Sequence, residues 1–321
     1  MAETINCGII ALAAALILGG CAKNHDEQTD IPDAPLAEIT VKDVRFVLPE
    51  IPYVGETDAE TETKVGFDLA SGGGFQLSWA ATDTLGVCPD TGSQIYFVVN
   101  DPTSQTVTFD GGGWALKNSS TYRSYLPFVG DIYLDPERVP VNFDGQFQDG
   151  SGAPQASVKA FLASTGTLEN ESMVFHFNCM NCYIRVTATL PAGTYRRMIL
   201  QTEDPLFVEK GIVDLTAANH VITGTKYSRM IYVDLDNFTL ASDGTLVAFI
   251  ASAPVNLNGV QVSVFFVDDS GIAYRCLKTP SRAYEANMLY GLTCSSFSVA
   301  DGFNFGITGW GSGGSYSGTA H

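Results

Sequence analysis

Basic residues are scarce in this chain of 321 residues. Lysine and arginine together number 17 against 35 aspartates and glutamates, which gives a formal net charge of −18 at pH 7. A surface with this charge repels the phosphate backbones of nucleic acids and the headgroups of anionic lipids. We therefore expect no nucleic-acid partner.

Histidine is scarcer still, and common catalytic motifs are missing. Of four histidines, His25 and His321 lie near the chain ends. No His-Glu-x-x-His pair and no Gly-x-Ser-x-Gly segment occurs. His176 alternates with phenylalanines and is expected on a strand surface, and His220 is expected in a loop. The sequence predicts no enzyme, no catalytic or metal-binding residue and no cofactor.

Cysteine is too infrequent for a disulfide scaffold. Five of the seven cysteines follow residue 21, at positions 88, 179, 182, 276 and 294. Cys179 and Cys182 have the spacing of a metal-ligand pair, but the second pair of a structural zinc site is missing. We interpret them as a turn that leads into a core strand. A Cys276–Cys294 disulfide across a terminal hairpin remains open.

Only one long apolar run occurs, close to the N-terminus. Residues 9–18 are all isoleucine, leucine or alanine, a run shorter than the about 20 residues that span a bilayer and typical of a signal peptide. Leu18-Gly19-Gly20-Cys21 follows, which resembles the lipobox of bacterial lipoproteins. The resemblance implies a signal peptide at residues 1–20, a lipidated Cys21 and, at residues 21–37, an acidic flexible tether.

Helical spacing is missing from every stretch of eleven or more residues, and alternation with period two takes its place. The alternating segments include residues 75–79, 95–99, 106–109, 183–190, 230–235, 244–250, 260–267 and 288–294. Residues typical of turns separate them. The pattern predicts an all-β fold with two β-sandwich domains in tandem, of transthyretin-like or Greek-key type.

Two polar, loop-like segments are candidates for the domain boundary, residues 149–154 and residues 164–170. The second is favoured, because a new alternating strand begins at residue 173. This gives an N-terminal β-sandwich domain of residues 38–168 and a C-terminal β-sandwich domain of residues 169–310. Residues 311–321 are rich in glycine and serine, which predicts a flexible tail.

Four segments in order along the chain carry a family resemblance. The first is a tryptophan strand followed by Asp-x-apolar-Gly-apolar (75–87), and the second is Tyr-x-x-Tyr-x-Pro-apolar (122–128). The third is a strand pair (173–177 and 183–186), and the fourth is the pattern that ends the second domain (274–293 and 303–310). Together with the lipobox they resemble the fimbrillins, pilus lipoproteins of Bacteroidales that include long-fimbria and Mfa-type subunits. In these segments we expect Trp79 to anchor the core, Asp83 to form a tight turn and Pro127 to end a strand.

The resemblance implies a cell-surface lipoprotein of the outer membrane that serves as a structural, tip or anchor subunit of a fimbrium. Its partners would be other fimbrillin subunits, added by β-strand exchange, the outer membrane through Cys21, and host or bacterial surface ligands. In that family a protease removes an N-terminal strand after an arginine, and Arg45 is the matching candidate. The expected donor strand is made of Phe303, Phe305, Ile307 and Trp310.

A second class of function remains open. Surface lipoproteins with β-sandwich modules often bind glycans, and aromatic side chains supply flat surfaces on which sugar rings stack. Trp114, Tyr122 and Trp310 are the candidates for such a platform. The alternative is therefore a cell-surface glycan-binding lipoprotein.

Overall fold

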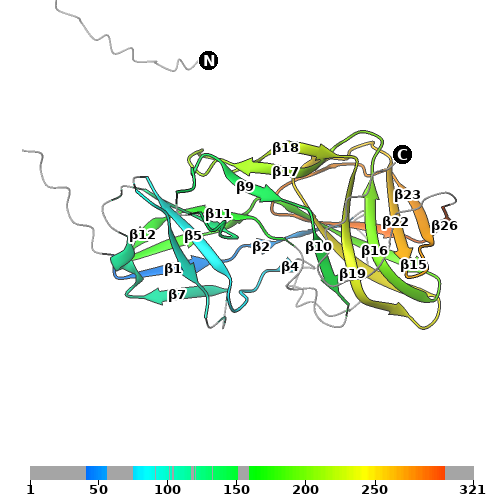
Figure 1. The fold of residues 1–321 in the computed structure, drawn as a ribbon, viewed down its shortest axis with the longest axis horizontal. Coiled ribbons are helices and arrows are strands. Elements are labelled where there is room, and N and C mark those ends of the chain that lie inside the picture. The colour runs from blue at the N-terminus through cyan, green and yellow to red at the C-terminus, as the bar shows by residue number, and fades with distance from the viewer. Residues whose placement is uncertain are drawn as a thin grey trace, which may run out of the picture. The chain divides into compact units, whose positions relative to one another are not determined.

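The computed structural model describes residues 41–300, apart from residues 56–74, 91, 101, 103–104, 117–118, 120, 132 and 151–158. The described chain consists of strands joined by turns, and its single helix is the short 3-10 helix η1 (Gly112–Ala115) (Figure 1). This confirms the predicted all-β class. Cys21, the predicted signal peptide and tether, the candidate donor strand and the predicted tail lie outside the described residues.

Two sheets make the first β-sandwich. One has the order β12 (Thr167–Glu169), β13 (Ser172–His176), β1 (Asp43–Val47) and β7 (Thr106–Asp110). The other has the order β14 (Asn178–Cys179), β11 (Leu162–Thr165), β8 (Tyr122–Leu126), β5 (Thr84–Pro89) and β6 (Ile95–Val98). The Phe97 ring of β6 lies 5.4 Å from that of Phe46 in β1 and 5.0 Å from that of Phe109 in β7. The two sheets therefore pack face to face through aromatic side chains.

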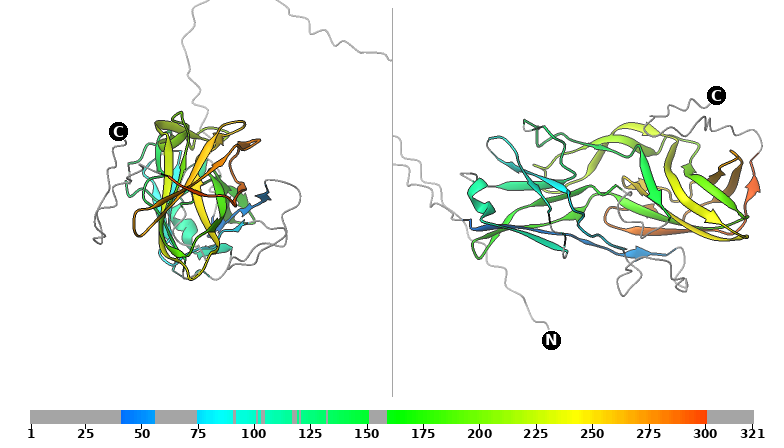
Figure 2. Two further views of the ribbon diagram at one scale, coloured as in Figure 1. Left: turned by 90° about the vertical axis from the view of Figure 1, so that its right-hand side faces the viewer. Right: turned by 60° about the horizontal axis from the view of Figure 1, so that its bottom comes forward.

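Two further sheets make the second β-sandwich. One has the order β10 (Gln146–Asp149), β19 (Met230–Leu240), β16 (Gly193–Gln201), β22 (Val262–Asp268), β23 (Ala273–Lys278) and β26 (Ser298–Val299). The other has the order β20 (Gly244–Ser252), β15 (Cys182–Leu190), β25 (Leu289–Cys294) and β3 (Tyr53–Val54). Every residue of β22 is buried, as expected for a strand covered on both faces. Figure 2 shows these strands from two further directions.

The remaining strands form smaller sheets. A three-stranded sheet has the order β18 (Ile222–Ser228), β17 (Phe207–Val213) and β9 (Val139–Asn142), and two pairs join β2 (Glu50–Ile51) to β4 (Phe75–Gln76) and β21 (Val255–Asn256) to β24 (Ala283–Tyr284). No helix in the described part of the chain has the length and apolar character needed to cross a membrane.

Segments on both sides of residue 168 contribute to each sandwich. Strand β1 pairs in parallel with β13, with Phe46 opposite Phe175. Conversely, two strands that precede residue 168 pair with strands that follow it: β9 with β17, and β10 in parallel with β19. Strands from before and after residue 168 therefore interleave. The domain division at residue 168 and the tandem arrangement stay predictions.

The segment around Trp79 differs from the prediction. Residues 75–79 were expected to form one strand, but β4 ends at Gln76. Asp83 Oδ2 accepts a hydrogen bond from the Ala80 amide at 2.8 Å, and Thr82 has a φ of 80°. This tight turn, expected for Asp83, ends the extended backbone early. Trp79 is still a core anchor, because it is 5% exposed and its indole N–H donates to the Gln105 carbonyl.

Candidate functional site

Strand β1 is an inner strand of its sheet, and its buried side chains lie in the core of the first sandwich. Its backbone pairs with β13 on one side and with β7 on the other, over residues 43–47 in both cases. Val44 and Phe46 are 0% exposed. The Phe46 ring stacks on that of Phe175 at 5.2 Å and lies 6.1 Å from that of Phe177. Any chain that replaced β1 would need apolar residues at alternate positions and free backbone groups on both edges.

Arg45, the candidate for proteolysis, lies in the middle of β1. Its side chain is 45% exposed, and Nη2 lies 3.5 Å from Asp43 Oδ2. Its backbone, however, stands opposite Val174 in β13 and Thr108 in β7. A protease that binds an extended backbone would reach the Arg45 bond only after β1 had separated from its neighbours.

The alternation of apolar residues slips in phase at Lys42 and Asp43, a pattern that by itself indicates a strand with a bulge. Instead β1 begins at Asp43, and its register with both neighbours is unbroken. The phase slip in the sequence thus marks the start of the strand. Pro127, by contrast, follows the end of β8 at Leu126, as predicted.

The Cys179–Cys182 pair lies in the core, as predicted. Cys179 ends β14, Cys182 begins β15, and both are buried. Burial raises the pKa of the Cys179 thiol to about 12, and it raises that of Cys182 further. Buried thiols that stay protonated are poor nucleophiles. Among the described residues, no three His, Cys, Asp or Glu side chains gather in a way that could hold a metal ion.

Cys276 and Cys294 are buried, and no disulfide joins them. The two cysteines do not lie on one hairpin. Strand β23, which carries Cys276, pairs with β22 and β26, whereas β25, which carries Cys294, pairs with β15 and β3 in a different sheet.

Both histidines of the described chain occupy their expected positions. His176 is exposed at the end of β13, with Nε2 3.5 Å from Glu169 Oε1. His220 lies in the loop between β17 and β18, and its Nε2 lies 3.2 Å from the Leu215 carbonyl oxygen. Burial lowers the pKa of His220, and the charge of Arg123 lowers it further.

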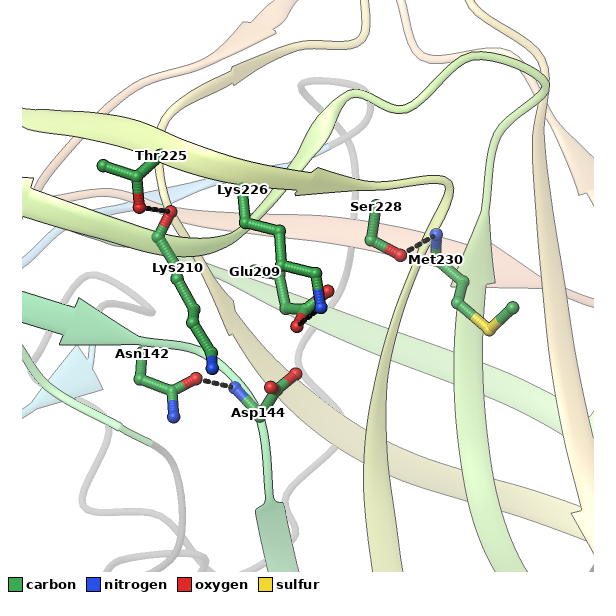
Figure 3. Close-up of polar contacts among 8 residues, drawn as sticks. All are labelled: Asn142, Asp144, Glu209, Lys210, Thr225, Lys226, Ser228 and Met230. Carbon is green, nitrogen blue, oxygen red and sulfur yellow. Dashed lines mark hydrogen bonds and ion pairs between the residues drawn. The ribbon is translucent and has the colours of Figure 1, made fainter. Parts of the chain in front are cut away.

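A cluster of charged residues, not foreseen from the sequence, joins β9 to β17 and β18 (Figure 3). Lys226 forms an ion pair with Glu209, and the Asp144 amide donates to Asn142 Oδ1 at 2.9 Å. Lys159 Nζ donates to the Asn142 carbonyl at 2.8 Å. Burial raises the pKa of the Asp144 carboxyl, and the Glu209 carboxylate adds to this effect. These residues are far apart in the sequence, so no local pattern predicts the cluster.

The predicted aromatic platform is not formed by Tyr122. This residue is 5% exposed, and its hydroxyl accepts a hydrogen bond from the Ser119 amide at 3.3 Å. Its ring therefore belongs to the core. Trp114 lies in η1, and Trp310 lies outside the described residues.

A pocket of about 210 Å³ opens in the second sandwich, beside the stacked rings of Tyr284 and Tyr290. Lys278 and Arg282 are its charged lining residues. No local sequence pattern predicts this pocket, because its walls come from three separate segments of the chain.

No protein-family model matches the chain, and no curated protein matches it. Solved structures do. A proposed cell adhesion protein from Bacteroides ovatus is 17% identical, with a TM-score of 0.45, over 81% of this chain and 96% of that one. The tip fimbrial protein Mfa3 of Porphyromonas gingivalis, truncated at its C-terminus, is 9% identical, with a TM-score of 0.36, over 70% and 98%. The fimbrial anchor protein Mfa2 of the same species is 12% identical, with a TM-score of 0.35, over 74% and 82%.

These neighbours are cell adhesion and fimbrial proteins.

Proposed function

We propose that this protein is a surface lipoprotein of the outer membrane, anchored through a lipidated Cys21, and a structural, tip or anchor subunit of a fimbrillin-type pilus. The lipobox and the ordered fimbrillin-like segments support the proposal from the sequence. The observation that carries it is the position of β1, a short central strand whose Val44 and Phe46 are fully buried.

Assembly would proceed by exchange of this strand. Without β1, the sheet would have a groove between β13 and β7, lined by the rings of Phe97, Phe109 and Phe175 that now contact Phe46. An open groove with unpaired backbone groups attracts a strand from a neighbour. Phe303, Phe305 and Ile307 have the same period-two spacing as Val44 and Phe46. The partner would thus be another subunit, with its C-terminal strand as the donor and proteolysis at Arg45 as the opening step.

Paired substitutions in the proposed donor strand test this model. Phe305→Asp places a charge on the face that would enter the groove, whereas Asn304→Asp, the matched control, places the same charge on the opposite face. We expect Phe305→Asp to abolish high-mass ladders on mildly denaturing gels and Asn304→Asp to keep them, with equal melting temperatures for the two monomers. Ladders that persist in Phe305→Asp, or a wild type without ladders, would exclude donation by this strand.

The anchor is tested separately with palmitate labelling. We expect Cys21→Ala to abolish incorporation and to release the protein from membranes, while Cys7→Ala, which lies before the apolar run, keeps both. Because one acyl chain binds a membrane only marginally, the mature form should carry more than one. Labelling that survives in Cys21→Ala would contradict the lipoprotein assignment.

A further inference from the structure

The walls of the 210 Å³ pocket are parts of paired strands and of the turn between two of them. The walls comprise Val54 at the end of β3 with the following Gly55, Lys278 at the end of β23 with the turn residues 279–282, Tyr284 of β24, and Tyr290 and Gly291 of β25. Strand β24 pairs with β21, and β25 pairs with β15 and β3. Backbone pairing therefore positions the strands that form part of the walls.

The charge of the pocket is opposite to that of the chain. Two cationic residues, Lys278 and Arg282, line it, and its described lining includes no acidic residue. The chain as a whole has twice as many acidic as basic residues. Among the described residues, Glu285 is an acidic neighbour of the pocket, and its amide donates to the Tyr290 hydroxyl at 2.8 Å. Such a local concentration of positive charge favours a small anion over a neutral ligand.

The other lining groups are suited to a ligand with several hydroxyls. Thr279, Ser281, Tyr284 and Tyr290 all carry a hydroxyl, a group that can both donate and accept a hydrogen bond. The Tyr290 hydroxyl already accepts from the Glu285 amide, which leaves its proton to donate. The rings of Tyr284 and Tyr290 stack at 4.2 Å with an interplanar angle of 6°, which fixes their positions. The pocket is smaller than the ~300–1,000 Å³ typical of drug-sized ligands, and so it is suited to one small polar ring.

Gly291 lines the pocket and lies close to Tyr53 of the neighbouring strand β3. A Cβ atom at position 291 would lie 2.4 Å from the Tyr53 hydroxyl, so a side chain there would require Tyr53 to shift. The Arg185 guanidinium lies 5.8 Å from the centroid of the Tyr53 ring.

We propose that this pocket binds an acidic sugar, one hexuronic acid residue of a polysaccharide, with Arg282 and Lys278 holding the carboxylate and the tyrosine, serine and threonine hydroxyls holding those of the ring. Arginine recognises carboxylates with two parallel hydrogen bonds, and lysine adds a point charge. This inference goes beyond the proposed pilus function and does not depend on it, because binding requires neither lipidation nor strand exchange.

The test is calorimetry on the full-length protein with glucuronic acid and with glucose, which differ by the carboxylate. We expect saturable binding of glucuronic acid and at least ten-fold weaker binding of glucose. Arg282→Gln should weaken the binding of glucuronic acid by about ten-fold, since losing a charged hydrogen bond typically has an effect of this size. Arg138→Gln, which removes the same charge from another exposed arginine, is the matched control and should bind like the wild type.

A second variant and two competing ligands test whether the binding is specific to this pocket and to the sugar. Lys278→Gln provides a second variant, and equal melting temperatures for all variants exclude misfolding as the cause of weaker binding. Inorganic phosphate and a tri-glutamate peptide serve as competitors. Four results would each overturn the proposal. The first is equal affinity for glucose and glucuronic acid, and the second is wild-type affinity in both Arg282→Gln and Lys278→Gln. The others are binding that does not saturate up to about 10 mM and tighter binding of either competitor.

Discussion

At Phe46 the two sheets of the first sandwich meet in a group of aromatic rings. The ring centroids of Phe175, Phe97 and Phe109 lie 5.2, 5.4 and 5.7 Å from that of Phe46. Arg45, the preceding residue of the same strand, points to solvent. Adjacent residues of β1 therefore contribute to stability by very different amounts.

Truncating Phe46 should thus destabilise the fold strongly. We expect Phe46→Ala to lower the free energy of unfolding by about 3–5 kcal/mol, because the transfer energy of the ring is lost and a cavity remains. Arg45→Ala should change it by less than about 1 kcal/mol, since its contact with Asp43 is an exposed ion pair. Urea unfolding of the two variants measures the difference, and equal effects would disprove the central role of Phe46.

The lowered pKa of His220 predicts a pH dependence of stability. Its pKa in the folded protein lies below the ordinary value of 6.5, chiefly because the ring is partly buried. Below pH 6.5 the unfolded chain therefore binds a proton that the folded chain does not, and stability is lost as the pH falls. The carboxyls of Asp83 and Asp144, with raised pKa values, act in the opposite direction near the acid end of the range.

We expect the melting temperature of the wild type to fall more between pH 7.5 and 5.5 than that of His220→Gln. Glutamine can still donate a hydrogen bond to the Leu215 carbonyl, which accepts one from His220 if that nitrogen is protonated. Thermal scans at both pH values for both proteins give the comparison. Parallel curves would show that His220 does not contribute to the pH dependence.

Strand β10 connects the two sheets of the second sandwich through hydrogen bonds of its side chains. The Gln146 amide group accepts from the Ala251 N–H at 2.8 Å and donates to the Ala251 carbonyl at 2.9 Å. Gln148 accepts from the Phe249 amide at 2.8 Å. These side chains bond to the backbone of β20, the last strand of its sheet, as a neighbouring strand would. They occupy backbone groups that an added strand would need.

Replacing Gln146 should open this edge. Gln146→Leu leaves two buried backbone groups of Ala251 without partners, and we expect a loss of about 2–4 kcal/mol in the free energy of unfolding. Phe147→Leu is the matched control, because Phe147 lies on the opposite face of β10 and is 42% exposed. Hydrogen exchange at the Ala251 amide should quicken in Gln146→Leu alone. Unchanged exchange there would show that the edge is protected in another way.

For the whole molecule, interleaving of the strands decides which segments can fold alone. Residues 38–168 lack β13, the parallel partner of β1, and Phe175, which stacks on Phe46. Residues 38–181 include every strand of the first sandwich. A boundary at residue 168 would instead predict an independently folded N-terminal domain.

We therefore expect residues 38–168 to be unfolded on their own and residues 38–181 to unfold cooperatively. The fragments differ in β13 and β14, which supply one neighbour of β1 and one edge of the facing sheet. Amide dispersion in NMR spectra and cooperative thermal unfolding distinguish folded from unfolded fragments. A shorter fragment that folds as well as the longer one would support the predicted boundary.

The sequence by itself determined the local features of this protein. Period-two alternation identified the β-strands, and Asp83, Pro127 and the Cys179–Cys182 pair occupy the turn, strand end and core positions expected of them. These features depend on residues close together in the chain, whose spacing alone indicates which face of a strand is buried.

Only the tertiary structure decided which strands are neighbours. It paired β1 with β13, put Cys276 and Cys294 in different sheets, placed the Gln146 amide on the edge of β20 and brought Arg282 beside Tyr290. An alternating segment records which of its faces is buried, but it does not record its partner. Strand pairing depends on backbone hydrogen bonds, which every segment can form, and on contacts across long loops, so it emerges only when the whole chain packs.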